Sequence, residues 1–249
     1  MNEPYGQGFE PENNTFYANQ GPDGVFSTNA RYETLAEYTA KTFGWMFAGL
    51  MVTFLVALAG YTSGIGILLL RNSLLFWGLA IAEIAVVMVM SARIHKIGVG
   101  TARGMFFLYA ALNGLVFSCY FYLYQMFDLV LAFGATALYF GIMAAYGYLT
   151  KQDLSGWAKP LMFGLIAMLI VSVFGIFFGG VNILLCCVGI VIFACYTAYD
   201  TQKIKAAYFA YAGNPELAKK ASVFSALELY LDFINLFLYI LRIFSRSRD

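Results

Sequence analysis

Five ionisable side chains stand inside or at the end of long apolar runs of the sequence. Glu83 lies midway along one run and Arg93 ends it, Asp200 ends a later run, and Glu228 and Asp232 lie in the last. An ionisable group is costly inside a bilayer, so such groups are functional candidates wherever the runs that carry them span a membrane. Acidic side chains at these positions suit proton exchange or cation binding.

The last apolar run carries its polar residues on one face. At about 100° per residue they fall within a single stripe about 100° wide, while the rest of the run is Leu, Phe and Ile. The stripe consists of Ser225, Glu228, Asp232, Asn235, Tyr239, Arg242 and Arg246. A polar stripe does not face lipid, so we expect this helix to be central, with the others packed around it.

The spacing of two aspartates from a turn predicts that they lie at similar depth. The segment 213–216 reads Gly-Asn-Pro-Glu, which is typical of one helix ending and another beginning. Asp200 stands 13 residues before Gly213, and Asp232 stands 17 residues after Pro215. At about 1.5 Å per residue these positions are about 20 and 26 Å from the turn of an antiparallel hairpin.

Two neighbouring carboxylates and a nearby arginine predict a proton switch. Ionising both carboxyl groups at once is costly in free energy, so the pair retains a shared proton. Arg93 ends a helix that runs toward the same side, whereas Glu83 lies about 15 Å deeper. At low proton concentration Asp200 pairs with Arg93, and protonation releases it. The alternative is an interhelical hydrogen bond that only specifies packing.

Cation binding is the second chemistry that these residues predict. Deprotonated carboxylates are hard oxygen ligands of the kind that Ca²⁺ prefers, which makes Asp200 and Asp232 candidate metal ligands. The residues expected to line an ion pathway are Glu83, Glu228 and Asn235. No resident cofactor is expected, and Ca²⁺ is expected only as an ion that passes through the protein.

The composition excludes several classes of protein. Of 249 residues, 61% are hydrophobic and 12% charged, against about 25% charged in an ordinary soluble domain, and the mean hydropathy is +0.72. A soluble fold of this length cannot bury so much apolar surface. The net charge of +1 gives no basic field for a nucleic acid. A soluble enzyme, a disordered protein and a nucleic-acid binder are therefore disfavoured.

The apolar runs predict an all-α membrane protein with seven transmembrane helices and the last helix central. They are continuous rather than alternating, and each is near the roughly 20 residues that a bilayer requires. The predicted spans are 43–69, 73–92, 104–124, 129–149, 161–181, 183–200 and 226–244. Residues 1–30 are rich in Gly, Asn, Pro and Gln and are predicted to be a flexible tail. Residues 31–249 then form the transmembrane domain.

Two finer expectations concern helix ends and orientation. The sixth helix should continue past the membrane to about Ala212, and the last should begin near Pro215 unless it breaks at 222–225. With the N-terminus on one side, eleven Lys and Arg lie on that side and four on the other, which predicts a cytoplasmic N-terminus. The basic C-terminal tail argues the other way.

Three motifs in order resemble the Bax inhibitor (TMBIM) family, above all its bacterial branch. Residues 229–237 (LYLDFINLF) resemble the family's last-helix signature, residues 199–204 (YDTQKI) its penultimate-helix motif, and residues 150–155 (TKQDLS) its bacterial loop motif. The similarity covers roughly residues 35–244. It implies seven helices with the last one central, and a pH-sensitive calcium leak.

The resemblance also implies roles for individual residues. The family's paired aspartates correspond to Asp200 and Asp232, its arginine latch to Arg93 and its acidic residue of helix two to Glu83. The Glu83–Arg93 spacing is one residue shorter than in a bacterial relative, and Glu228 stands where that relative has an uncharged residue. The bacterial branch also contains partners of a membrane-anchored AAA protease.

Several functions therefore compete. A passive Ca²⁺ leak of the bilayer is favoured by the stripe on the last helix. The alternative is a regulator of a membrane protease, with residues 1–30 as the segment that binds this partner. An intramembrane aspartyl protease is disfavoured because no GxGD motif precedes Asp232, and a retinal pump because the last span lacks lysine. We therefore expect no enzyme and no nucleic-acid partner, and, from the bacterial motifs, an inner (plasma) membrane location.

Overall fold

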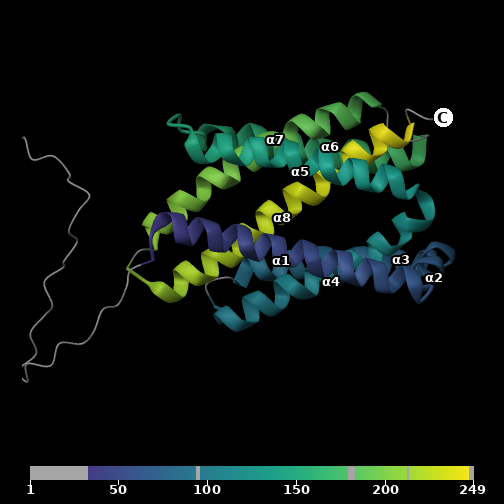
Figure 1. The fold of residues 1–249 in the computed structure, drawn as a ribbon, viewed down its shortest axis with the longest axis horizontal. Coiled ribbons are helices and arrows are strands. Elements are labelled where there is room, and N and C mark those ends of the chain that lie inside the picture. The colour runs from purple at the N-terminus through teal and green to yellow at the C-terminus, as the bar shows by residue number, and fades with distance from the viewer. Residues whose placement is uncertain (1–32, 94–95, 179–182, 212, 247–249) are drawn as a thin grey trace, which may run out of the picture. The chain divides into compact units, whose positions relative to one another are not determined.

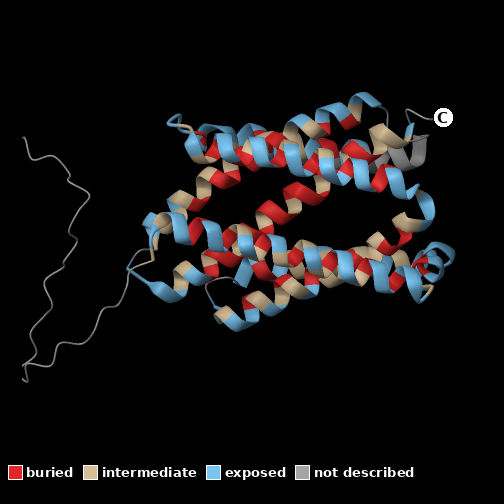
Figure 2. Cartoon of the chain, in the orientation of Figure 1, coloured by how far each residue is buried: buried red, intermediate tan, exposed pale blue. Residues whose placement is uncertain are grey.

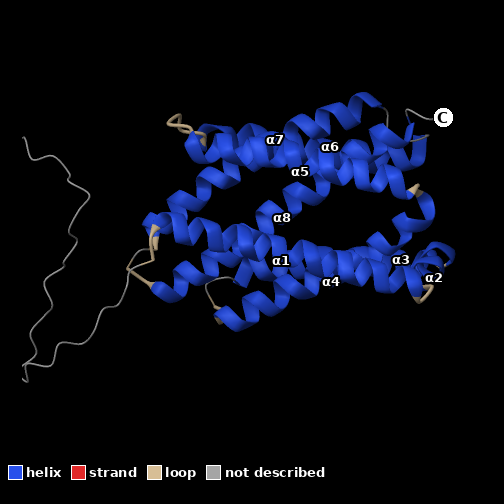
Figure 3. Ribbon diagram, in the orientation of Figure 1, coloured by secondary structure: helices blue, strands red, loops and turns tan. Residues whose placement is uncertain are grey.

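The described part of the chain consists of helices joined by short loops (Figure 3). A computed structural model describes residues 33–93, 96–178, 183–211 and 213–246, without the side chains of 169 and 172–178. No strand occurs within these ranges, so the all-α prediction holds there. The predicted tail, 1–30, lies outside the described residues.

The helices follow one another along the unit Thr34–Asp249. Figure 1 shows α8 crossing obliquely between α1–α4 on one side and α5–α7 on the other. Their bounds are α1 (Leu35–Thr62), α2 (Ile65–Arg71), α3 (Ser73–Arg93), α4 (Val99–Leu123), α5 (Met126–Leu149), the 3₁₀ turn η1 (Ser155–Trp157), α6 (Ala158–Phe178), α7 (Ile183–Ala210) and α8 (Pro215–Arg246).

Six of the described helices are long and apolar enough to cross a membrane: α1, α3, α4, α5, α7 and α8. They correspond to six of the seven predicted spans. The remaining span, 161–181, overlaps α6 but ends among residues 179–182, outside the described part. Six is therefore the number of candidate spans that the described residues support, and the count of seven stays a prediction.

The first predicted span, 43–69, is wrong as a single helix. The chain divides there into α1 and α2, with Gly64 between them at φ 78°. Glycine adopts this left-handed conformation without the steric cost that a Cβ imposes. The start is also earlier than predicted, because Thr34 and Glu37 form a reciprocal capping box at the N-terminus of α1.

The predicted hairpin between the last two helices is confirmed. α7 ends at Ala210 and α8 begins at Pro215, where the Asn214 side chain accepts a hydrogen bond from the Leu217 N–H at 3.1 Å. α8 runs through 222–225 without a break. Ser222 lies 2.8 Å from the Thr42 hydroxyl of α1, which gives a buried polar side chain its partner.

α8 is the most enclosed of the six candidate spans. It packs against α1, α4, α5 and α7, and 67% of its most apolar window is buried, against 6–39% for the other five. Figure 2 shows buried residues along the middle of α8 and exposed residues on the outer faces of α1 and α5. Within the polar stripe, Ser225 and Asp232 are buried, and the other members are half-buried apart from the exposed Arg246. The middle of the stripe therefore lies partly inside the helical unit, as expected for polar residues that avoid lipid.

Candidate functional site

Asp200 of α7 and Asp232 of α8 meet in the interior of the helical unit. Both side chains are buried, and their carboxyl groups adjoin closely enough for a hydrogen bond between them. Such a bond requires a proton on one carboxyl, because two ionised carboxylates can only accept. The geometry therefore brings together the two residues that the hairpin arithmetic places at similar depth.

A second acid and a lysine complete this cluster. Glu228 precedes Asp232 by one turn of α8, Lys203 follows Asp200 by one turn of α7, and the Lys203 ammonium forms an ion pair with Glu228. The charge of Lys203 also acts on Asp200 and on Asp232. We call these four residues the acid cluster.

The acid cluster is short of positive charge and of hydrogen-bond donors. Three carboxyl groups share one ammonium, so a fully ionised cluster is more negative than its buried surroundings tolerate cheaply. Asp232 Oδ2 and Glu228 Oε2 are buried and have no hydrogen-bond partner among the described residues. Buried oxygens in this state favour binding a proton or a cation.

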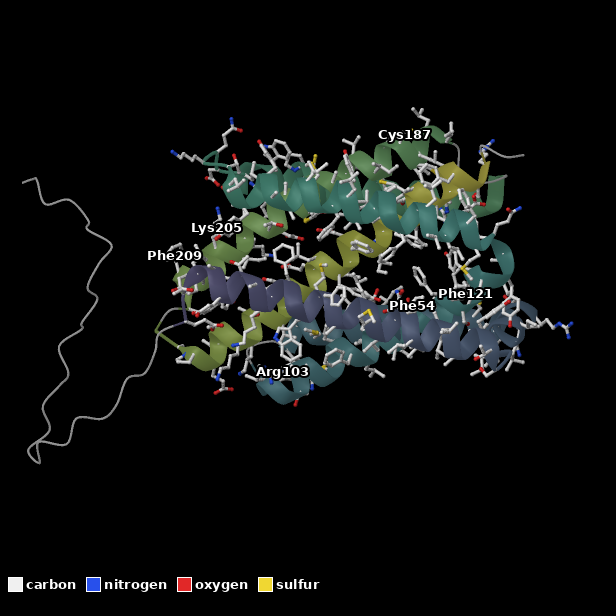
Figure 4. All side chains as sticks on the ribbon, in the orientation of Figure 1. Phe54, Arg103, Phe121, Cys187, Lys205 and Phe209 are labelled. Carbon is white, nitrogen blue, oxygen red and sulfur yellow. The ribbon has the colours of Figure 1, made fainter. Side chains whose placement is uncertain are left out.

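A close contact between α5 and α7 fixes the position of Asp200 along the direction of the helices. Gly147 of α5 lies so near α7 that a Cβ at this position would stand 2.2 Å from the Ala198 carbonyl oxygen. The Lys205 ammonium donates to the Tyr148 carbonyl near the end of α5 and also lies over the Tyr148 ring, 4.6 Å from its centroid. Figure 4 labels Lys205 on this part of α7. α5 and α7 are thus joined on both sides of Asp200.

The loop after α5 is tied to the same stretch of α7. Gln202 donates to the Gln152 carbonyl at 2.7 Å and accepts from the Leu154 N–H at 2.8 Å. Within the loop, the Ser155 N–H and hydroxyl donate to Asp153 at 2.9 and 2.8 Å, which lowers the pKa of Asp153 below its ordinary 3.8. Two of the three sequence motifs therefore contact each other.

Glu83 lies apart from the acid cluster. It stands on α3, which packs against α4, and its charge acts on Tyr109 of α4 and Tyr230 of α8. It is not among the groups whose charge acts on Asp200 or Asp232. Its Oε1 atom is buried without a hydrogen-bond partner in the described part of the chain.

Arg93 and Asn235 also stand outside the acid cluster. Arg93 is exposed at the end of α3, and its charge is not among those acting on the aspartates. The Asn235 side chain donates to the Leu231 carbonyl of its own helix at 2.8 Å. The roles predicted for these two residues stay predictions.

The metal ligation predicted for Asp200 and Asp232 rests on two carboxyl groups. Among the described residues no group of three or more His, Cys, Asp or Glu is arranged to hold a metal ion. Ca²⁺ takes about six to eight oxygen ligands, so two carboxyls suit a brief encounter better than a resident ion.

Lys203 is the residue of the cluster that the sequence argument missed as a functional group. It was counted only among the charges that set orientation. The signal was present, because a residue three positions after Asp200 lies on the same face of a helix. What the sequence did not contain was the position of Glu228 across the helix interface.

Comparisons with known proteins identify a matching family and several similar chains. A family described as "Inhibitor of apoptosis-promoting Bax1" (Bax1-I) matches residues 35–249. The chain is 39% identical over 218 residues to inner membrane protein YbhL of Escherichia coli K12, covering 86% of this chain and 93% of YbhL. It is 36% identical over 216 residues to a protein of Borreliella burgdorferi, covering 86% of this chain and 93% of that protein. A protein of Deinococcus radiodurans is 35% identical over 216 residues, covering 85% of this chain and 91% of that protein.

Proposed function

Because the chain belongs to the Bax inhibitor family, we propose that it is a Ca²⁺ leak of the membrane, gated by the proton that Asp200 and Asp232 share. The observation that carries the proposal is the acid cluster: two adjoining buried aspartates with a lysine–glutamate ion pair one helical turn away. Buried acids of this kind are costly to stability, and in membrane proteins they mark ion or proton pathways.

The shared proton acts as the switch through electrostatic repulsion. Two unit charges about 4 Å apart repel by about 4 kcal/mol at an effective dielectric constant of about 20. Uptake of one proton removes this repulsion and weakens the hold of the aspartates on Lys203. The contact between α7 and α8 therefore changes with pH, and we expect ion flux to rise as the pH falls.

Ca²⁺ is cargo in this scheme and not a resident ion. The unpartnered oxygens of Asp232 and Glu228 supply hard ligands, and water supplies the others. These protein ligands are too few to hold Ca²⁺ for long. Conduction requires binding that is weak enough to release the ion. Asn235, on the same stripe of α8, and Glu83, on α3, extend the proposed pathway.

We place the protein in a bacterial inner membrane with its N-terminus in the cytoplasm. The name of the E. coli relative supports the membrane, and the excess of Lys and Arg on one side supports the orientation.

The test is Ca²⁺ entry into liposomes that hold the purified protein, measured from pH 5 to 8. The wild type is compared with Asp200→Asn and Asp232→Asn, which keep side-chain size and remove the shared proton. We expect pH-dependent flux in the wild type and loss of the pH dependence in both variants.

Asp128→Asn is the matched control. Asp128 is also a buried aspartate, but it lies 20 residues before Tyr148 on α5, or about 30 Å away along the helix. Its flux should keep the wild-type pH profile. Folded wild-type protein that gives no flux above empty liposomes would refute the leak, and equal pH profiles in all variants would refute the gate.

The alternative function, regulation of a membrane-anchored AAA protease, depends on residues 1–30 as the handle. This segment lies outside the described residues. Deleting it should abolish capture of the protease and spare ion flux; intact capture would exclude the segment as the handle.

A further inference from the structure

An apolar pocket of about 380 Å³ lies between α1, α4, α5 and α8, and no residue of the acid cluster lines it. Its walls are almost entirely aliphatic and aromatic. Phe54 of α1 and Phe121 of α4 are among its lining residues and lie near each other in Figure 4. Phe233, Ile234 and Phe237 of α8 also line it.

The pocket offers a polar ligand no side chains but those of Thr53 and Tyr120. Its one hydroxyl-bearing aliphatic residue, Thr53, is already engaged, since its Oγ1 lies 2.6 Å from the Tyr230 hydroxyl and 2.9 Å from the Ala110 carbonyl. No carboxylate lines the pocket. A cavity whose walls are almost entirely apolar stays dry and accepts apolar molecules.

The pocket is continuous with the lipid-facing surface of two candidate membrane spans. Phe54 on the α1 side is 52% exposed, and Val130 on the α5 side is 64% exposed. Large apolar side chains exposed on a membrane-spanning helix meet acyl chains, so the occupant nearest to this opening is the bilayer itself.

The two terminal stretches outside the described residues have compositions that do not suit an apolar pocket. Outside the described residues, the N-terminal 32 residues are rich in Gly, Asn, Pro and Gln, and the last three are Ser, Arg and Asp. Such residues do not supply a long apolar plug.

We propose that an acyl chain of a membrane lipid enters this pocket sideways between α1 and α5 and lies against α8. The volume agrees with this occupant: about 150 Å³ holds a benzene molecule, and ligand pockets run from about 300 Å³ upward. An acyl chain here touches Phe233, the residue next to Asp232. Lipid binding in this pocket does not depend on ion flux, so it can be supported or refuted whether or not the proposed leak is correct.

The test is photo-crosslinking in liposomes made with a phospholipid that carries a diazirine in its acyl chain. Labelled peptides are mapped by mass spectrometry. We expect labelling to concentrate on pocket residues such as Met51 and Met126, above that of Leu138, which is 68% exposed on the outer face of α5.

Two tryptophan variants and one control make the test specific. Ala57→Trp fills the pocket, and Val130→Trp obstructs its rim without entering the buried core. Leu138→Trp adds the same ring to the same helix outside the pocket. Pocket labelling should fall severalfold in the first two variants and stay unchanged in the control, with folding checked by thermal unfolding.

Two results would overturn the proposal. If labelling is as strong at Leu138 as in the pocket and is unchanged by Val130→Trp, it follows surface exposure alone. The probe then reports only lipid at the protein surface. Protein–protein crosslinks through the pocket residues, in place of lipid adducts, mean that a second copy covers the opening.

Discussion

The contact between Gly147 and Ala198 predicts a large difference between two glycine-to-alanine substitutions on α5. A Cβ at residue 147 would stand 2.2 Å from the Ala198 carbonyl oxygen and 2.8 Å from its carbonyl carbon. At Gly141, which lies on the same helix, nothing lies within 4 Å of an added Cβ. The pair therefore isolates the interhelical contact.

The size of the effect follows from these distances. Carbon atoms pack at about 3.5–4.0 Å, so Gly147→Ala must push α5 from α7 by more than about 1 Å. The atom in the way is backbone, which does not yield by changing rotamer. Overpacking of this kind costs about 1–3 kcal/mol or more. Gly141→Ala meets no atom and gains up to about 1 kcal/mol in helix propensity.

Equilibrium unfolding in mixed detergent micelles measures this difference, and liposome flux provides a second readout. Since Asp200 follows Ala198 by two residues, the displacement also moves Asp200 relative to Asp232. We expect Gly147→Ala to lower the free energy of unfolding and to alter the pH profile, and Gly141→Ala to do neither. Equal stability and equal pH profiles in the two variants would refute the argument.

Three further predictions concern the polar contacts. Lys203→Met and Glu228→Gln should each destabilise the protein, and a double-mutant cycle of unfolding should give a coupling free energy of about 0.5–1 kcal/mol, because the Lys203 side chain is 39% exposed; full additivity would dismiss the ion pair. Thr53→Val removes the partner of the buried Tyr230 hydroxyl and should cost about 1–3 kcal/mol in unfolding, a loss that adding Tyr230→Phe reduces. Asp153→Asn should leave the pH profile of flux from pH 5 to 8 unchanged. The lowered pKa of Asp153 means that its contribution is present above 3.8 and lost only as the pH falls through the lower, folded-state value; a displaced profile would show that this loop takes part in gating.

Much of the fold follows from short-range properties of the sequence. Runs of apolar residues must form helices in a bilayer because every backbone polar group needs an internal partner. The turn at 213–216 ends one helix and begins the next through local capping, which the Asn214 side chain provides. The polar stripe of the last run requires enclosure, and α8 is the most enclosed candidate span.

Other features depend on how helices cross. The first span divides at Gly64, a residue that hydropathy alone does not distinguish from the glycines inside other spans. In the sequence, Lys203 contributes only to the excess of Lys and Arg on one side, and Arg93 is the predicted partner of Asp200. Which cation reaches the aspartates depends on the rotation of α7 and the position of α3, and both are set by long-range packing.

The sequence by itself determined that Asp200 and Asp232 lie at similar depth, because residue counts from a turn fix height along a hairpin. The tertiary structure decided what surrounds them: Lys203 of α7 is paired with Glu228 of α8, whereas Glu83 lies apart from them, near Tyr230. It also decided that α1 and α5 leave an apolar pocket beside α8. Height along a helix is a local quantity, whereas neighbours across an interface depend on the rotation and crossing of helices distant in sequence.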